Sequence, residues 1–247
     1  MKPDANFAFF SADATVLEYA RAAVGVGLWE SEKKLLAENF PRDAKILELG
    51  AGAGRVSLAL AKLGYAWLTV SDFAPAMVEI AREIFADAGV SDCAEFRVED
   101  ATELAFPNAV FDGAIFAFNG WQMIPRRARR ERALAEIARV LKPGGIFFFT
   151  GHDRTHPLRK AHWEAERARW ENGEKPAELD EFGDSFYATP HGNVFIHSAE
   201  PGEVRVALAD AGFAVEFSEL RSRVCAEPEN VREFSDDTRL WLARKRS

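Results

Sequence analysis

Three alternating glycines, Gly50, Gly52 and Gly54, follow directly on a short apolar segment at residues 44–49. Glycine lets a backbone turn sharply and approach a bound group closely. Apolar residues at helical spacing begin just after the glycines, so the free N–H groups of a helix start lie at the same turn. A buried strand, a glycine turn and a helix start in this order predict a site for a nucleotide-type ligand.

The residues around the glycines indicate which nucleotide-type ligand binds at this turn. A dinucleotide-binding loop reads G-x-G-x-x-G and holds a pyrophosphate on its backbone amides. Here Arg55 stands where the third glycine is needed, and Glu48 lies at the end of the preceding strand. A carboxylate there repels a pyrophosphate and suits a ligand that carries an ammonium group, as S-adenosylmethionine does. A dinucleotide loop and a purely structural turn are the alternatives.

Two more carboxylates follow the next two predicted strands, at residues 66–70 and 95–98. Asp72 comes about 20 residues after the first glycine, where an acidic side chain accepts hydrogen bonds from a ribose diol. Asp100 is placed to accept a hydrogen bond from an adenine amine. The alternative roles are a helix-start carboxylate for Asp72 and solvation of a loop for Asp100.

A regular alternation of strands and helices positions these side chains. Further strands are predicted at residues 111–118, 146–150, 213–220 and 239–244, and a helix at 203–211. Segments with apolar residues at helical spacing follow the first, second and fourth predicted strands of the chain. The strand at 111–118 is almost wholly apolar, as a strand buried on both faces of a parallel sheet requires. The pattern predicts an α/β fold with a doubly wound, mostly parallel sheet.

Two segments lie outside this alternation. Residues 11–40 are predicted to be helical, either covering a sheet edge or forming a lid that places Tyr19 or Trp29 against the ligand. Residues 152–199 contain all five histidines, which suggests an insertion with a chemical task. We expect no metal, because His152 and His156 do not form an H-E-x-x-H motif. An aromatic or apolar acceptor pocket, or alternatively the core, is predicted for Trp121, Trp163, Phe186 and Tyr187.

The composition restricts the class of protein. With 247 residues, 48% of them hydrophobic, the chain can bury one sizeable core. The net charge of −8 disfavours a broad nucleic-acid surface, and the arginines at 126–132 are interpreted as a solvated helical face, with substrate or RNA contact as the alternative. Cys93 and Cys225 have no metal-binding spacing, and no apolar run approaches about 18 residues, so we expect a cytoplasmic protein.

Taken in order, these motifs resemble the class I S-adenosylmethionine-dependent methyltransferases. The resemblance rests on residues 48–54, Asp72, Asp100 with Ala101, the segment from Phe111 to Asn119, and residues 138–145. It implies a single Rossmann-like domain over residues 1–247, with a seven-stranded sheet whose last strand is antiparallel. Residues 11–40 then form an N-terminal helical lid, and residues 152–199 form a cap over the substrate. Residues 27–32, 118–120 and 150–154 resemble a bacterial subgroup of generic small-molecule methyltransferases.

The resemblance also implies S-adenosyl-L-methionine as cofactor and S-adenosyl-L-homocysteine as product. Glu48 and the glycine backbone would hold the methionine part, Asp72 the ribose and Asp100 the adenine. The residues 119–121 depart from the N-P-P-Y signature, which disfavours methylation of amide nitrogens and adenine. The implied cofactor-binding set is Glu48, Gly50, Ala51, Gly52, Gly54, Asp72, Phe73, Met77, Asp100, Ala101, Phe118 and Asn119.

We therefore hypothesise SN2 transfer of a methyl group to a small-molecule acceptor, in which catalysis is mainly alignment. His152, just after the fifth strand, is the candidate general base, and Asp153 would orient it. The alternative for His152 is a hydrogen-bonded loop residue. Three other functions stay open: a nicotinamide-dependent oxidoreductase, a non-catalytic protein that binds S-adenosylmethionine or a partner, and an RNA methyltransferase.

Overall fold

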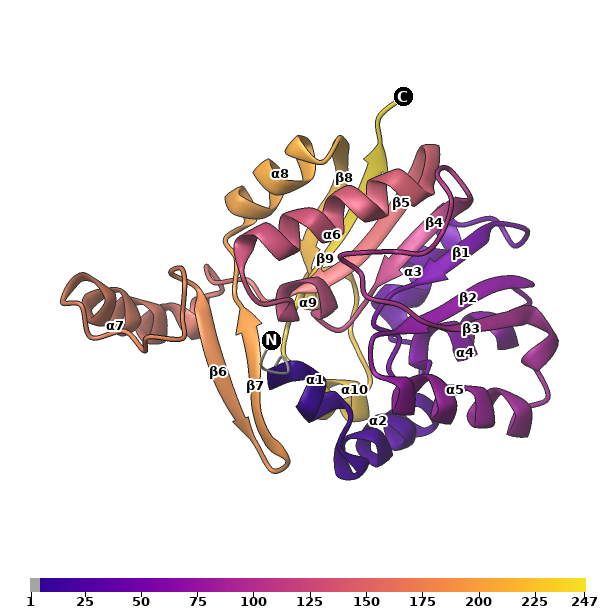
Figure 1. The fold of residues 1–247 in the computed structure, drawn as a ribbon, viewed down its shortest axis with the longest axis horizontal. Helices are drawn as coiled ribbons and strands as arrows, with labels where there is room; N and C mark the ends of the chain where they lie inside the picture. The colour runs from indigo at the N-terminus through magenta and orange to yellow at the C-terminus, as the bar shows by residue number, and fades with distance from the viewer. Residues whose placement is uncertain (1–4) are drawn as a thin grey trace.

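A seven-stranded sheet forms the centre of the computed structural model, which describes residues 5–247 (Figure 1). The first four residues of the expected domain lie outside the described part. The strand order is β3-β2-β1-β4-β5-β9-β8; β1 to β5 run parallel, and β9 is antiparallel to both its neighbours. The predicted fold class is thus confirmed. The strands are β1 (Lys45–Glu48), β2 (Trp67–Asp72), β3 (Ala94–Val98), β4 (Phe111–Phe116), β5 (Leu141–Gly151), β8 (Phe213–Leu220) and β9 (Arg239–Lys245).

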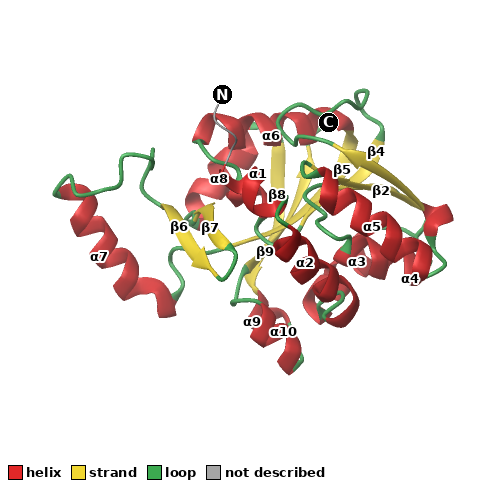
Figure 2. Ribbon diagram, turned by 60° about the horizontal axis from the view of Figure 1, so that its bottom comes forward, coloured by secondary structure: helices red, strands yellow, loops and turns green. Residues whose placement is uncertain are grey.

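Helices cover both faces of this sheet (Figure 2). Successive strand residues point to opposite faces, so Ile46 and Phe148 face one apolar cluster while Leu47 and Phe149 face the other. Helices α3 (Glu30–Asn39), α4 (Arg55–Lys62) and α5 (Pro75–Asp87) pack on the first face, and α6 (Arg127–Val140) and α8 (Pro201–Asp210) on the second. Among the described helices, none combines the length and the apolar character needed to cross a membrane.

The segment between β5 and α8 projects away from the sheet, on the left of Figure 1. It contains α7 (Lys160–Glu171) and a separate antiparallel pair, β6 (Asp184–Thr189) and β7 (Gly192–His197). Helix α1 (Ala5–Phe10), which the sequence pattern did not predict, lies beside β7. The Asn6 side chain joins them, because it donates to the Phe195 carbonyl (3.0 Å) and accepts from the Phe195 amide (2.7 Å).

The predicted helical segment 11–40 forms two helices, α2 (Asp13–Gly25) and α3, with a break at Gly27, whose φ is +64°. The segment between the predicted strands at 213–220 and 239–244 contains two short helices, α9 (Arg221–Val224) and α10 (Glu229–Phe234). Glu227 explains their place: its carboxylate accepts the backbone N–H groups of Glu30 and Ser31 at the start of α3. Chain segments from both ends thus pack together.

A buried ion pair attaches α3 to the helix that follows the glycine turn. Arg55 donates to Glu32 through two nitrogens, each at 2.7 Å, and its guanidinium lies over the Trp29 ring. The Arg221 guanidinium lies over the same ring, and each guanidinium carbon is 4.8 Å from the ring centre. Arg55, the residue that breaks the dinucleotide pattern, therefore has a structural role between helices.

Glu32→Gln should destabilise the fold by roughly 3–5 kcal/mol, because a buried Arg55 would lose its counter-charge. Urea unfolding followed by circular dichroism measures the effect. Glu30→Gln is the matched control: its pair with Lys33 is half-exposed, so we expect a loss of about 1 kcal/mol or less. Equal stability of the two variants would contradict a structural role for the Glu32–Arg55 pair.

Candidate active site

The glycine turn and the ends of β2, β3 and β4 meet at one edge of the sheet, where ligands bind in folds of this kind. A groove, which we call the strand-end groove, runs along this edge. Tyr19 and Phe118 lie on it together with residues that the sequence predicted. Its predicted lining residues are Gly50, Gly52, Asp72, Phe73, Asp100, Ala101 and Phe118.

The three glycines differ in what they do. Gly50 and Gly52 both have φ of +54°, and a Cβ would lie 2.5 Å from the Phe116 ring at the first and 2.9 Å from the Tyr19 ring at the second. Gly54, expected to bind the ligand, instead lies against Phe85, 3.0 Å from its would-be Cβ. It allows α4 and α5 to pack closely. Met77, also expected at the ligand, is wholly buried in a core cluster.

Glu48 is buried at the end of β1, where it lines a small second pocket with Gly50, Ala51 and Arg55. We call this the glycine-loop pocket. The Glu48 carboxylate accepts from the Ser57 amide (2.8 Å) and from the Ser57 hydroxyl. Burial nevertheless raises the pKa of Glu48 to about 7. A cation bound in this pocket would keep the carboxylate ionised.

Asp72 ties three elements together. Its carboxylate accepts from the backbone amides of Gly52 and Ala74, both at 2.9 Å, so it joins the glycine turn to the end of β2 and the start of α5. Burial raises the pKa of Asp72 to about 6. Each carboxylate oxygen has a second lone pair, so the helix-start role leaves capacity for ligand hydroxyls.

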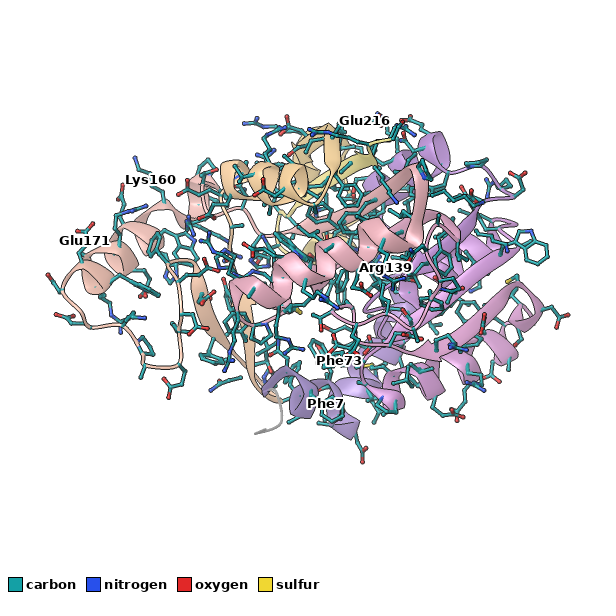
Figure 3. All side chains as sticks on the ribbon, turned by 45° about the horizontal axis from the view of Figure 1, so that its top comes forward. Phe7, Phe73, Arg139, Lys160, Glu171 and Glu216 are labelled. Atoms are coloured by element: carbon teal, nitrogen blue, oxygen red, sulfur yellow. The ribbon has the colours of Figure 1, made fainter. Side chains whose placement is uncertain are left out.

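The far end of the groove is polar and partly exposed. Asp100 accepts from the Thr102 amide (2.8 Å) and pairs with Arg129 (3.2 Å). Helix α1 closes the groove from the N-terminal side, where Phe7 lies edge-on to Phe73, their ring centres 5.7 Å apart (Figure 3). The sequence reasoning missed the lining residues Asn6, Phe10, Glu99, Met123 and Arg129. Only Glu99, next to Asp100 at a strand end, carried a signal.

Strained backbone follows β4. Phe118 and Asn119 have φ of +51° and +65°, a conformation that costs energy outside glycine and concentrates at functional sites. The Phe118 ring stacks on Phe234 of α10, with ring centres 5.0 Å apart. The Asn119 side chain is buried, and its Oδ1 has no hydrogen-bond partner among the described residues.

A third cavity adjoins the other two. It is lined by His152, Asn119 and Tyr187, among others, and we call it the histidine cavity. Tyr19 and Phe118 line all three spaces: the strand-end groove, the glycine-loop pocket and the histidine cavity. A ligand that extends from the groove into the glycine-loop pocket would therefore have its middle beside the histidine cavity.

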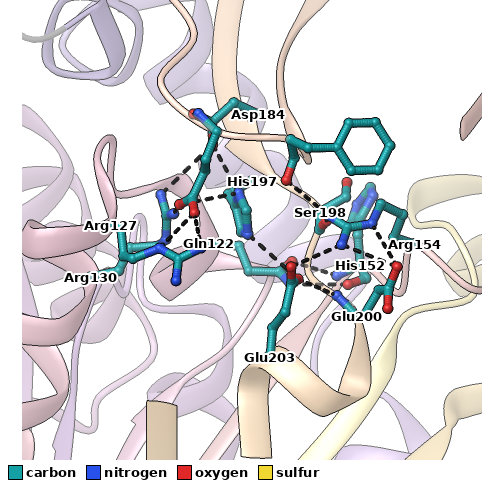
Figure 4. A network of polar contacts seen from close by, with 12 residues as sticks. Gln122, Arg127, Arg130, His152, Arg154, Asp184, His197, Ser198, Glu200 and Glu203 are labelled. Carbon is teal, nitrogen blue, oxygen red and sulfur yellow. Dashed lines mark hydrogen bonds and ion pairs between the residues drawn. The ribbon is translucent and has the colours of Figure 1, made fainter. Parts of the chain in front are cut away.

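His152 presents a half-buried ring to this cavity, and its Nδ1 has no partner within the described chain. Burial, with the positive charge of Arg159, lowers the pKa of His152 to about 4, so the imidazole is neutral at physiological pH. Gln122 fixes the backbone here: its Oε1 accepts from the His152 amide (2.6 Å) and its Nε2 donates to the His152 carbonyl (2.9 Å; both residues are labelled in Figure 4). Gly151 leaves room, since a Cβ there would lie 2.8 Å from the Gln122 amide carbon.

Asp153 does not orient His152 in this structure. Its carboxylate accepts from the Thr155 amide (2.8 Å) and pairs with Arg239 (2.9 Å). Neighbouring side chains on extended backbone point to opposite sides, which explains why Asp153 turns toward β9. Gln122, which the sequence did not single out, provides the positioning contact at His152.

The six predicted substrate residues separate into two groups. Tyr19 and Tyr187 line the histidine cavity, and the Tyr187 and His152 rings are 5.9 Å apart. Trp29, Trp121 and Trp163 are buried elsewhere: Trp29 between two arginines, Trp121 with its indole N–H on the Arg130 carbonyl, and Trp163 against Phe182. Phe186 is 41% exposed and packs on Phe195. The three tryptophans are therefore core residues and do not line the histidine cavity.

Three of the other histidines pair with acids: His156 with Asp237, His191 with Glu18, and His197 with Asp184. Glu181, Asp184 and His197 lie close enough together to hold a metal ion. However, the buried Arg130 pairs with Glu181, so a cationic side chain already lies in this cluster. Arg130, Asp184 and His197 are labelled in Figure 4. Arg127 and Arg129 of the same helix pair with Glu181 and Asp100.

Comparison with known proteins agrees with this geometry. Residues 46–145 match the model of a family described as a methyltransferase domain. The chain is 34% identical over 123 residues to a ubiquinone/menaquinone biosynthesis C-methyltransferase UbiE of Ralstonia pickettii, covering 48% of this chain and 47% of that protein. It is 38% identical over 117 residues to a sterol 4-C-methyltransferase of Caenorhabditis elegans, covering 47% and 32%. The chain thus matches about half or less of the length of these relatives.

Among solved structures, an S-adenosylmethionine-dependent methyltransferase of Methanosarcina mazei superposes with a TM-score of 0.70 at 22% identity, covering 89% of this chain and 99% of that one. The fold and the strand-end carboxylates are those of the class I S-adenosylmethionine-dependent methyltransferases, and residues 46–145 resemble a methyltransferase domain in sequence. The site fits the cofactor, because the buried Glu48 carboxylate, whose pKa is about 7, can pair with an ammonium group.

Affinity for S-adenosylhomocysteine should fall about twentyfold between pH 8 and pH 6, about tenfold from Glu48 and about twofold from Asp72. The free enzyme holds Glu48 with a pKa near 7, so it protonates over this range, while the ligand ammonium binds the carboxylate form. Calorimetric titration at several pH values measures the effect. Glu48→Gln should bind more weakly and retain only about a twofold pH effect, from Asp72. An equally steep profile in Glu48→Gln would contradict the assignment.

Asp72→Ala should weaken S-adenosylhomocysteine binding roughly tenfold or more, the value of a lost hydrogen bond to a charged group. Asp87→Ala, at an exposed position on the same α5 helix, is the control and should leave the affinity unchanged. Calorimetry decides, with the melting temperature of each variant recorded to separate unfolding from lost binding. Unchanged binding by folded Asp72→Ala would remove Asp72 from the site.

Proposed function

We propose that this protein transfers a methyl group from S-adenosylmethionine to a small-molecule acceptor by direct SN2 displacement, with His152 as general base. The observation that carries the proposal is the junction at Tyr19 and Phe118, where the two cofactor spaces and the histidine cavity meet. The middle of the cofactor, where its sulfonium lies, would then be adjacent to the space that holds His152.

In this proposal Glu48 binds the ammonium group, Asp72 the ribose hydroxyls, and Asp100 with Ala101 the adenine edge. Phe73 lies beside the adenine. Gly54 and Met77 support these residues through packing. The bound cofactor supplies a methyl group that is already activated by the sulfonium charge, so the protein contributes mainly alignment.

The chain's own groups perform the remaining steps. His152, neutral and without a partner at Nδ1, removes the proton that the acceptor loses. The Gln122 side chain fixes the position of the His152 backbone through two hydrogen bonds. Tyr19, Phe118 and Phe234 surround the junction with rings, which excludes water from it.

The relatives support a small acceptor. Besides the two described above, a ubiquinone biosynthesis O-methyltransferase of Xanthomonas axonopodis is 33% identical over 115 residues, covering 47% of this chain and 46% of that protein. The RNA alternative weakens, because Arg127, Arg129 and Arg130 already pair with acids of this chain. A cytoplasmic location stays a prediction from the cysteine pattern.

His152→Gln should lower the turnover number about 100-fold or more in a transfer assay with labelled methyl donor, through loss of the base. S-adenosylhomocysteine should still raise the melting temperature of this variant, whereas NAD should not. His162→Gln, at an exposed position on α7, is the matched control. Turnover in His152→Gln equal to that control would refute the base assignment. Stabilisation of the wild type by NAD and not by S-adenosylhomocysteine would refute the function itself.

A further inference from the structure

The histidine cavity has the size and the lining of a site for one aromatic ring. Its volume is about 220 Å³, and a cavity of roughly 150 Å³ suffices for benzene. Five aromatic side chains from five separate segments line it. They are Phe9, Tyr19, Phe118, Tyr187 and Phe234. Rings attract one another in stacked and edge-on arrangements, so the wall favours a planar aromatic ligand over an aliphatic one.

Two residues of this wall carry hydrogen-bond acceptors that lack donors. Asn119 Oδ1 and, in the tautomer with its proton on Nε2, His152 Nδ1 are both buried without partners among the described residues. An unsatisfied buried polar atom costs free energy that a ligand donor would recover. The Asn119 backbone is held at positive φ, and Gln122 fixes His152, so both acceptors are held in place before a ligand binds. The cavity lining therefore favours a ligand that donates hydrogen bonds.

The charges at the cavity exclude acidic ligands. Glu18 and Asp236 line it, and among its described lining residues there is neither lysine nor arginine. Arg159, which acts on His152 electrostatically, is already paired with Asp236 and donates to the Tyr187 hydroxyl (2.7 Å). A carboxylate or phosphate on the ligand would meet two carboxylates and no lysine or arginine among the described lining residues.

We propose, building on the proposed function, that the acceptor is an uncharged single-ring aromatic molecule with hydroxyl groups, and that one hydroxyl oxygen is methylated. A neutral aromatic amine already has a nucleophilic lone pair, whereas a hydroxyl oxygen gains nucleophilicity as its proton leaves. The unpartnered base at His152 is therefore needed for an oxygen acceptor. A second, adjacent hydroxyl, as in a catechol, would donate to Asn119 Oδ1.

The reaction balances within the site. A lone pair of the hydroxyl oxygen forms the new C–O bond, while the electron pair of the broken C–S bond stays on sulfur. The hydroxyl proton passes to His152 Nδ1. The imidazolium that forms faces the carboxylate of Asp236, which favours the charged ring.

Binding without turnover tests the acceptor class separately from catalysis. Calorimetry with S-adenosylhomocysteine present would compare 4-methylcatechol with 3,4-dimethoxytoluene, which has no donors, and 3,4-dihydroxybenzoate, which adds a negative charge. We expect 4-methylcatechol to bind at least about tenfold more tightly than either. Asn119→Gly keeps the positive φ and removes the acceptor oxygen, so it should weaken 4-methylcatechol binding alone. Asn172→Gly, at an exposed position, is the control.

With S-adenosylmethionine, mass spectrometry should then find a mono-O-methylated catechol. Equal binding of the dimethoxy or carboxylate analogue, or methylation of 3,4-diaminotoluene in place of the catechol, would overturn the proposal. If S-adenosylhomocysteine binds and 4-methylcatechol does not, the acceptor class is wrong while cofactor binding stands. Failure of S-adenosylhomocysteine itself to bind would refute the proposed function instead.

Discussion

A single buried carboxylate, that of Asp72, holds the candidate site together. By accepting the amides of Gly52 and Ala74 it fixes the glycine turn against the end of β2 and sets where α5 begins. The two helix starts and the two strand ends of the groove are consequently parts of one rigid unit. Removing this carboxylate from water raises its pKa, a cost that a hydrogen-bonding ligand would partly recover. The same group thus serves the fold and, in the proposed function, would also bind the ligand.

The remaining walls of the site come from the two ends of the chain. Helix α2 brings Tyr19 onto Gly52, and α10 brings Phe234 onto Phe118. Glu227 and the Glu32–Arg55 pair lock the N-terminal helices to the glycine-turn helix and to the segment before β9. A buried ion pair is a weak source of stability but a strong constraint on geometry. The Glu32–Arg55 pair lies between the covering helices, so it helps to fix the positions of the Tyr19 and Phe234 rings.

The sequence pattern predicted what depends on periodicity. The strands of the sheet and the residues at their ends follow from alternating burial and from the glycine turn, so Glu48, Asp72 and Asp100 lie where they were expected. The sequence pattern did not predict features that depend on tertiary contacts. Helix α1 has only six residues, and its role follows from tertiary contacts such as those of Asn6 with Phe195 and of Phe7 with Phe73. Gln122 carries no periodic signal. Asp153 was paired with the wrong neighbour, because adjacency in sequence says nothing about the side to which an extended residue points.

The electrostatics of His152 suit the proposed place of its ring beside a positively charged donor. A cation near an imidazole lowers the pKa of the ring, and burial with Arg159 already lowers the pKa of His152. The ring therefore keeps a free lone pair while the donor is charged. In the proposed reaction the donor would lose its positive charge as His152 gains one beside Asp236. One positive charge would then move within the site and none would be created, so a weakly basic buried histidine would suffice.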